Sequence, residues 1–225
     1  MSADTSSTLD MARISDISPD PRRPGRLRIF VDEKIVATLG RSRVEQLSLS
    51  VDQEWTSVLR QHVEAEAAID AVVRQAMRML NRRAMTRAEM EGKLGERGHD
   101  QDVVAEGLDR LERLGALDDA QVGRLMVAQL TRDRPAGAAL LVEKLCARGL
   151  SEDLAERIVG DHLSGDDAEA SARALVEQRL PSLRHCDPPT RARRLAGLLA
   201  RRGFDEQTIE SVVGAVVEID DFESA

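Results

Sequence analysis

Aromatic residues are nearly absent from this chain of 225 residues. There is no tyrosine, one tryptophan and three phenylalanines, so that aromatic side chains make up only 2% of the sequence. A large β-sandwich draws on aromatic and β-branched side chains, and this composition therefore argues against one. Alanine, leucine, glutamate and arginine are abundant instead, and these residues favour helices.

Cysteine and long apolar runs are also scarce. The two cysteines, Cys146 and Cys186, are too few for a disulfide framework and are typical of a reducing compartment. No apolar run approaches the length of a membrane span. The N-terminal stretch is acidic and lacks the apolar core of a secretory signal. We therefore expect a cytoplasmic protein that does not contact a membrane.

The charge of the chain also excludes a class of function. Charged residues make up 32% of the sequence, and the formal net charge is −8 at pH 7. A protein whose main task is to coat nucleic acid needs a net basic surface, because it must neutralise phosphates. The interspersed charges of both signs are typical of solvated helical surfaces instead.

The N-terminal region has the periodicity of strands. Residues 26–31, RLRIFV, alternate arginine with apolar side chains, which predicts a half-buried strand. Residues 35–39 are predicted to return as a second strand, and residues 14–18 are a candidate third. A small sheet is marginal alone, so we expect it to pack against the helices that follow. Residues 1–13 are predicted to be a disordered tail.

One phrase occurs three times in the rest of the chain. It consists of a helix end, an Arg-Gly pair and a residue that can cap a new helix. Glycine ends a helix at low steric cost, because it readily adopts a left-handed backbone conformation. The three glycines and the capping residues that follow them are Gly98 with Asp100, Gly149 with Ser151, and Gly203 with Asp205.

The predicted fold class is mainly α, a tandem array of three three-helix repeats preceded by a small N-terminal β-hairpin or sheet and a disordered tail. Apolar spacing predicts a helix over residues 52–83, and Thr86 with Glu89 forms a capping box at the start of the next helix. Units this small share cores with their neighbours. The predicted divisions are 14–69 for the β element and linking helix, then 70–119, 120–164 and 166–219 for the repeats.

Residues 76–119 carry a resemblance to a known family. They read AMRMLNRRAMTRAEMEGKLGERGHDQDVVAEGLDRLERLGALDD, which resembles the first repeat of RecX family regulators of the RecA recombinase. The N-terminal RLRIFVDEKIVATL is similar to the strand-turn-strand start of that family. The resemblance covers about residues 14–217. The second-repeat pattern is matched by Arg134, Gly137, Leu141, Leu145 and the pair Arg148-Gly149.

Two departures from the family pattern stand out. The hairpin turn has Asp32-Glu33 where the family commonly has Asp-Gly. After Gly137, where basic residues are usual, this chain has Ala138, Ala139 and Leu140. The segment 138–146 is therefore apolar nearly all round. Two explanations stay open, deeper burial or apolar contact with a partner.

Signatures of catalysis and cofactor binding are missing from the sequence. There is no phosphate-binding glycine loop, no dinucleotide fingerprint, no HExxH and no CxxC. The neighbours His185 and Cys186 are most simply an exposed loop pair. The acidic stretch at 165–167 is explained by a helix cap rather than by a metal site. We therefore expect no catalytic residue, no cofactor and no metal.

Arginines are the remaining candidates for a functional site. They form clusters at related places in the three repeats, and an arginine fork suits both carboxylate and phosphate. They are either ordinary solvated helix surface or a basic stripe along the concave side of the array. The candidate partner-binding residues are Arg82, Arg83, Arg87, Arg132, Arg134, Arg191, Arg193, Arg194, Arg201 and Arg202.

The resemblance implies a regulatory protein that is not an enzyme. Such a protein binds the RecA-DNA filament, where DNA is a further candidate contact, and modulates recombinase, ATPase and coprotease activity, with inhibition as the expected direction. We expect it to be a monomer. An alternative that stays open is a stand-alone DNA-binding helical module, which requires the basic clusters to converge on one face.

Overall fold

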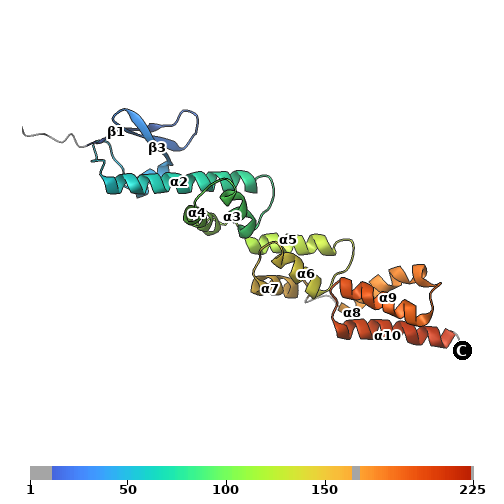
Figure 1. Cartoon of the computed structure of the whole chain (residues 1–225). Coiled ribbons are helices and arrows are strands. Elements are labelled where there is room, and N and C mark those ends of the chain that lie inside the picture. The colour runs from blue at the N-terminus through green and yellow to red at the C-terminus, as the bar shows by residue number, and fades with distance from the viewer. Residues whose placement is uncertain (1–11, 164–167, 224–225) are drawn as a thin grey trace, which may run out of the picture. The chain divides into compact units, whose positions relative to one another are not determined.

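The alternating residues of the N-terminal region form a three-stranded antiparallel sheet in the computed structural model, which describes residues 12–163 and 168–223. Strands β1 (Ile14–Pro19), β2 (Arg26–Val31) and β3 (Lys34–Gly40) lie in chain order across the sheet (Figure 1). Asp32 and Glu33 form the hairpin turn, and both have left-handed φ angles, 48° and 61°. Two-residue hairpins need such angles because their twist then matches that of the strands. The predicted third strand is confirmed.

Helices make up most of the remaining described residues, which confirms the mainly-α prediction. A short 3-10 helix, η1 (Leu180–Leu183), lies between α8 and α9. The α-helices are α1 (Arg41–Gln46), α2 (Ser57–Leu80), α3 (Arg87–Gly95), α4 (Gln101–Arg113), α5 (Asp119–Thr131), α6 (Ala138–Cys146), α7 (Glu152–Leu163), α8 (Ala168–Arg179), α9 (Pro188–Arg201) and α10 (Glu206–Glu223).

The start of α2 differs from the prediction. The helix begins at Ser57 rather than near residue 52, because Thr56 caps it by accepting a hydrogen bond from the Leu59 backbone N–H. Trp55, just before the cap, is buried in the core of the sheet instead of lying on a helix. The short helix α1 was not predicted, since six residues are too few to show a period.

The described chain forms two compact units. The first runs up to Arg82 and includes Lys93–Ala116; the second comprises Arg83–Gly92 and the chain from Leu117 onward. Helix α3 passes from one unit to the other.

In the first unit the sheet packs on α2, and α2 packs on α4. Apolar residues from all three strands and from α2 form the core between them. Glu66 on α2 links this helix to α1 and α4. Arg43 of α1 lies 2.8 Å from the Glu66 carboxylate, and Arg110 of α4 donates two hydrogen bonds to it, of 2.9 and 3.0 Å. Gly107 of α4 permits close packing, since a Cβ there would lie 2.6 Å from Val72 Cγ1.

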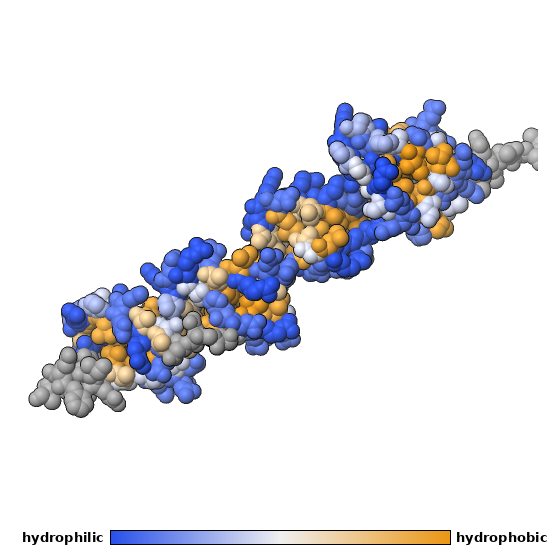
Figure 2. Space-filling model, turned by 180° about the vertical axis from the view of Figure 1, so that it is seen from behind, coloured by the Kyte–Doolittle hydropathy of each residue, from blue (hydrophilic) through white to orange (hydrophobic). Residues whose placement is uncertain are grey.

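In the second unit the helices group in threes. Helices α5, α6 and α7 share one apolar core, and α8, α9 and α10 share another. Figure 2 shows patches of apolar residues surrounded by a largely hydrophilic surface. Among the described residues no helix is both long and apolar enough to cross a membrane.

The three predicted Arg-Gly turns are confirmed in detail. Gly98, Gly149 and Gly203 have φ angles of 80°, 86° and 78°, in the left-handed region that glycine tolerates. After each turn the expected residue caps the next helix by accepting hydrogen bonds from backbone N–H groups. Those caps are Asp100, Ser151 and Asp205.

Some predictions concern residues outside those described. They are the disordered tail at residues 1–11 and the helix cap at Asp166 or Asp167. Arg13, the last residue of the predicted tail, is described and forms an isolated antiparallel β-bridge with Glu54 through the backbone. The boundaries predicted for the three repeats stay a prediction.

Candidate functional site

The site begins with a joint that places the α5–α6 loop beside α9. Arg202, which follows the last residue of α9, donates hydrogen bonds from Nε to the Pro135 carbonyl at 2.8 Å and from Nη2 to the Arg134 carbonyl at 2.7 Å. In return, its own carbonyl accepts a hydrogen bond from the Gly137 N–H at 2.8 Å. These contacts fix the loop backbone at Arg134 and Pro135 against the end of α9.

Two glycines make this joint possible. A Cβ on Gly137 would lie 2.1 Å from the Gly203 carbonyl oxygen, and one on Gly203 would lie 2.3 Å from the Leu140 nitrogen. Both neighbours are backbone atoms, which cannot move aside as a side chain could. Leu140 is half-buried here, while Leu141 and Leu145 are fully buried in the core of α5–α7. Burial therefore accounts for much of the apolar character of segment 138–146.

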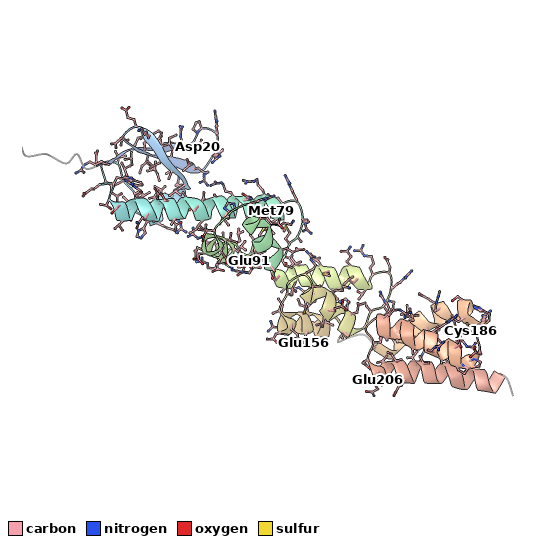
Figure 3. All side chains as sticks on the ribbon, viewed as in Figure 1. Asp20, Met79, Glu91, Glu156, Cys186 and Glu206 are labelled. Carbon is pink, nitrogen blue, oxygen red and sulfur yellow. The ribbon has the colours of Figure 1, made fainter. Side chains whose placement is uncertain are left out.

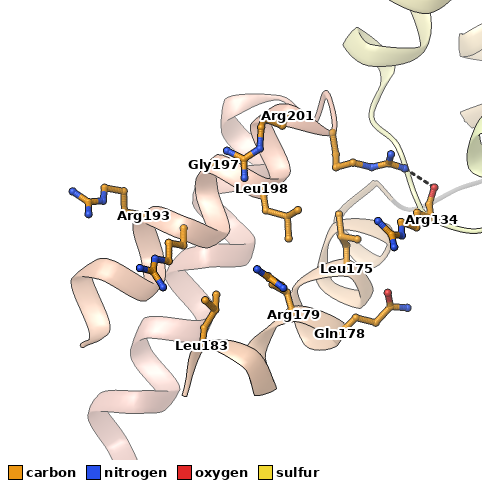
Figure 4. Close-up of a pocket in the computed structure, with 11 residues that line it drawn as sticks. Arg134, Leu175, Gln178, Arg179, Leu183, Arg193, Gly197, Leu198 and Arg201 are labelled. Atoms are coloured by element: carbon orange, nitrogen blue, oxygen red, sulfur yellow. Dashed lines mark hydrogen bonds between the residues drawn. The ribbon is translucent and has the colours of Figure 1, made fainter. Parts of the chain in front are cut away.

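A pocket of about 650 Å³ lies beside this joint (Figure 4). Arginines come to it from the α5–α6 loop, from the end of α8 and from α9, as the labelled side chains show. Six of its lining residues are arginines and none is acidic. The lining residues are Arg134, Leu175, Gln178, Arg179, Leu183, Arg193, Arg194, Gly197, Leu198, Arg201 and Arg202.

The six arginines differ in what they already bind. Arg202 is committed to the loop carbonyls, and Arg194 donates to the Cys186 sulfur at 3.0 Å. The other four have no ion pair with any carboxylate among the described residues. Their guanidinium groups are exposed and free to bind an anion. These four are Arg134, Arg179, Arg193 and Arg201.

The electrostatics of the pocket favour an anion. Burial lowers the pKa of Arg202, and the nearby positive charge of Arg134 lowers it further. Arginine starts from so high a pKa that it remains charged at neutral pH. Mutual repulsion of this kind is relieved when an anion enters, so each guanidinium adds to the attraction for one. Planar forks of this type bind carboxylates and phosphates through paired hydrogen bonds.

A glycine shapes the pocket floor on α9. Gly197 lies one turn from both Arg193 and Arg201 along the helix. A Cβ at this position would come within 3.3 Å of the Arg201 Nη1 atom. The absence of a side chain therefore leaves room for the Arg201 guanidinium over the pocket.

The pocket unites half of the arginines that the sequence proposed. Arg134, Arg193, Arg194, Arg201 and Arg202 all line it. Arg179 also lines it and was missed, because it is the last residue of α8 and stands alone in the sequence. Only packing of α8 against α9 brings it to the others.

The remaining proposed arginines lie elsewhere. Arg87 begins α3 and forms an ion pair with Glu91 at 2.8 Å, and Arg83 lies 3.8 Å from Glu89. Arg82 is exposed after α2, Arg132 is exposed after α5, and Arg191 is half-buried on α9. None of these five lines the pocket, and a single basic stripe through all three repeats stays a prediction.

The histidine and cysteine candidates form no site in the part of the chain that the structure describes. His185 is exposed, and Cys186 lies at the loop before α9 (Figure 3). No group of three or more His, Cys, Asp or Glu side chains that could hold a metal ion occurs among the described residues.

The fold is that of a known class of helical proteins with a small N-terminal sheet. A crystal structure of a regulatory protein RecX superposes with a TM-score of 0.75 over 89% of this chain and 98% of that one, at 19% identity. The crystal structure of RecX from Lactobacillus salivarius gives a TM-score of 0.58 over 66% of this chain and 96% of that one. At such low identity the likeness shows the fold alone.

Sequence comparisons identify the family. The family model described as RecX, first three-helix domain, matches residues 73–111. The regulatory protein RecX of Pelodictyon phaeoclathratiforme is 30% identical over 142 residues, which span 63% of this chain and 86% of that protein. The regulatory protein RecX of Mycobacterium sp. strain JLS is 35% identical over 141 residues, 61% of this chain and 76% of that protein. The chain belongs to the RecX family of regulatory proteins.

Proposed function

We propose that this RecX-family chain binds the RecA-DNA filament and thereby inhibits recombinase, ATPase and coprotease activity. The arginine pocket supplies one contact with the filament. The protein acts as a cytoplasmic monomer by occupying a surface rather than by catalysis. Family membership supports the regulatory role, and the pocket is the single observation that supports a binding site at this place in the fold.

An acidic segment of the recombinase suits the pocket. Four exposed guanidinium groups line it without carboxylate partners among the described residues, and each can donate paired hydrogen bonds to a carboxylate. The whole chain carries a net charge of −8, which weakens attraction to free nucleic acid. A local basic pocket on an acidic protein favours a chosen anionic partner over general coating of DNA.

A stand-alone DNA-binding module is the alternative function, because the pocket can also bind phosphates. The same forks that hold carboxylates also hold phosphates, so the pocket alone does not discriminate between them. The two functions differ in their requirement for RecA. A DNA-binding module retards single-stranded DNA without recombinase, and its affinity falls steeply with salt.

The test is the ATPase activity of RecA on single-stranded DNA with the protein titrated in. Binding along a filament is expected to inhibit at well below one molecule per recombinase subunit, because one bound molecule affects several neighbours. Absence of inhibition, combined with tight binding to DNA in the absence of RecA, would favour the alternative. A heat-denatured sample of the same protein provides the control for non-specific effects.

A further inference from the structure

The three Arg-Gly turns are alike in backbone geometry but differ in what covers them. At the second turn, the start of α3 docks on Arg148 and Gly149. The Thr86 hydroxyl donates to the Arg148 carbonyl at 2.7 Å, and a Cβ on Gly149 would lie 2.3 Å from the Ala88 Cβ. The Arg148 guanidinium grips Glu89 with two hydrogen bonds, 2.6 and 3.1 Å long.

The third turn is covered in a related way. The carbonyl of Arg202 accepts a hydrogen bond from the backbone N–H of Gly137. Gly137 is the residue just before α6, as Thr86 is the residue just before α3. The Arg202 guanidinium again reaches across to the docked segment, here to its carbonyl groups. In both joints, therefore, an Arg-Gly turn receives the first residues of a helix, through the arginine carbonyl and the arginine side chain.

The first turn has the same form and no such cover. Arg97 and Gly98 are exposed, and an added Cβ on Gly98 would meet nothing within 4 Å. No hydrogen bond from a described residue reaches the Arg97 carbonyl. The start of α3 contacts the second turn and the start of α6 contacts the third, so neither helix start covers the first turn.

Arg97 is held in the same manner as Arg148. Its Nη1 atom lies 2.9 Å from the sulfur of Met79, near the end of α2 (Figure 3), just as Arg148 Nη1 lies 3.9 Å from the sulfur of Met126 on α5. Arg148 completes its contacts with a carboxylate, whereas Arg97 has no ion pair among the described residues. The side chain is thus positioned on its own helix pair and lacks the anionic half of the joint.

The surroundings of Arg97 are basic. A hollow of about 310 Å³ beside it is lined by Gln75, Arg78, Met79, Arg82 and Arg97, with no acidic residue. Its occupant must therefore supply negative charge as well as a backbone that can approach Gly98. A helix start with a hydroxyl cap and a glutamate three residues later supplies both, as Thr86 and Glu89 do in this chain.

We propose that the turn at Arg97 and Gly98 is a vacant joint that receives the start of a capping-box helix from the protein partner. The incoming cap donates to the Arg97 carbonyl, a small side chain packs on Gly98, and the glutamate enters the Arg97 fork. The inference rests on the proposed function for the identity of the partner, the RecA filament. It adds a second contact, distinct from the arginine pocket, and specifies its chemistry.

The test uses filaments of RecA on single-stranded DNA and the full-length protein with single substitutions. Arg97→Ala is expected to weaken filament binding by about tenfold, and Arg97→Lys by about threefold, because lysine keeps the charge and loses the paired geometry. Arg60→Ala is the matched control, since Arg60 is an exposed arginine on α2 of the same unit. Arg97 is exposed, so its replacement is expected to leave the unfolding curve unchanged.

A photo-crosslink identifies the occupant. Replacement of the exposed Glu96 by benzoylphenylalanine places the reactive group beside the turn. The expected result is a crosslink to the first turn of a RecA helix. That turn should begin with a capping side chain that is followed three residues later by a glutamate. Crosslinks to DNA or to a strand, or wild-type affinity of Arg97→Ala, would overturn the proposal while leaving filament binding intact. Failure of the wild-type protein to bind filaments overturns both proposals.

Discussion

At the scale of single residues, the contact between Arg148 and Glu89 is the most informative. Glu89 belongs to a capping box, which its sequence spacing predicts, and it also accepts both hydrogen bonds from Arg148. The second role could not be predicted, because the two residues are 59 positions apart in the chain. One carboxylate thus serves a local motif and a tertiary joint at the same time.

Replacing Glu89 by alanine is expected to lower the free energy of unfolding by about 2 kcal/mol, since it removes a cap and leaves a partly buried arginine without its partner. Urea unfolding followed by circular dichroism measures the change. Glu91→Ala is the matched control, because Glu91 on the same helix makes an exposed ion pair with Arg87. We expect that control to change stability by less than about 0.5 kcal/mol. Equal effects of the two substitutions would contradict the assigned role.

The same carboxylate is expected to make stability depend on pH. Burial raises the pKa of Glu89, but hydrogen bonds from Arg148 and from the Thr86 backbone outweigh burial and bring it below its ordinary value of 4.5. A depressed folded-state pKa stabilises the protein above the unfolded value, and the gain is lost as pH falls through the folded pKa. The stability difference between the wild type and Glu89→Gln should therefore hold between about pH 7 and about pH 5, and shrink as the pH falls below the ordinary value of 4.5 and through the lower folded-state pKa. A difference that stays constant down to about pH 3 would contradict this, because it would mean that the pKa of Glu89 is the same in the folded and unfolded states.

At the scale of elements, the joint between α6 and the end of α9 depends on two glycines. Gly137→Ala places a Cβ against the Gly203 carbonyl, and backbone on both sides resists any shift. We expect a loss of about 3 kcal/mol or more in unfolding free energy, or separate unfolding of the last three helices. Gly160→Ala on α7 is the control, because its Cβ would meet nothing within 4 Å and alanine favours helices. That control should raise stability by about 0.5–1 kcal/mol.

Sequence patterns predicted elements well where the signal was local. Each Arg-Gly turn carries its own stop and its own cap, so the three turns were found at the correct residues. The start of α2 was wrong because Trp55 has helical spacing relative to Val58 and Leu59, yet it packs into the sheet. Period alone cannot separate an apolar residue on a helix from one that precedes it and turns toward another core.

The candidate site was only partly predictable for the same reason. The arginines of α9 stand close together in the sequence and were found. Arg179 contributes from α8 alone, and no local pattern distinguishes it from an ordinary surface arginine. The role of Arg202 as a structural contact was likewise invisible, because its carbonyl partners lie 67 and 68 residues away.

At the scale of the whole molecule, a local basic pocket on an acidic chain has a consequence for salt dependence. Charges at the edge of a protein–protein interface act mainly on the association rate, and salt screens them. When a protein neutralises DNA phosphates instead, its affinity falls far more steeply with salt concentration. We expect affinity for RecA filaments to fall by about tenfold or less between about 50 and 200 mM salt. A fall of about a thousandfold or more would indicate that the protein mainly contacts DNA phosphates.

The most direct test of the account is the affinity of a pocket variant for RecA filaments on single-stranded DNA, measured by fluorescence anisotropy of labelled protein. The variant combines Arg179→Ala, Arg193→Ala and Arg201→Ala, which spare the structural Arg202. Arg157→Ala is the control, because Arg157 is an exposed arginine on α7 outside the pocket. We predict that the triple variant binds at least about thirtyfold more weakly, with an unchanged unfolding curve, and that the control binds as the wild type does. Wild-type affinity of the triple variant would contradict the account, because the arginine pocket would then have no part in binding.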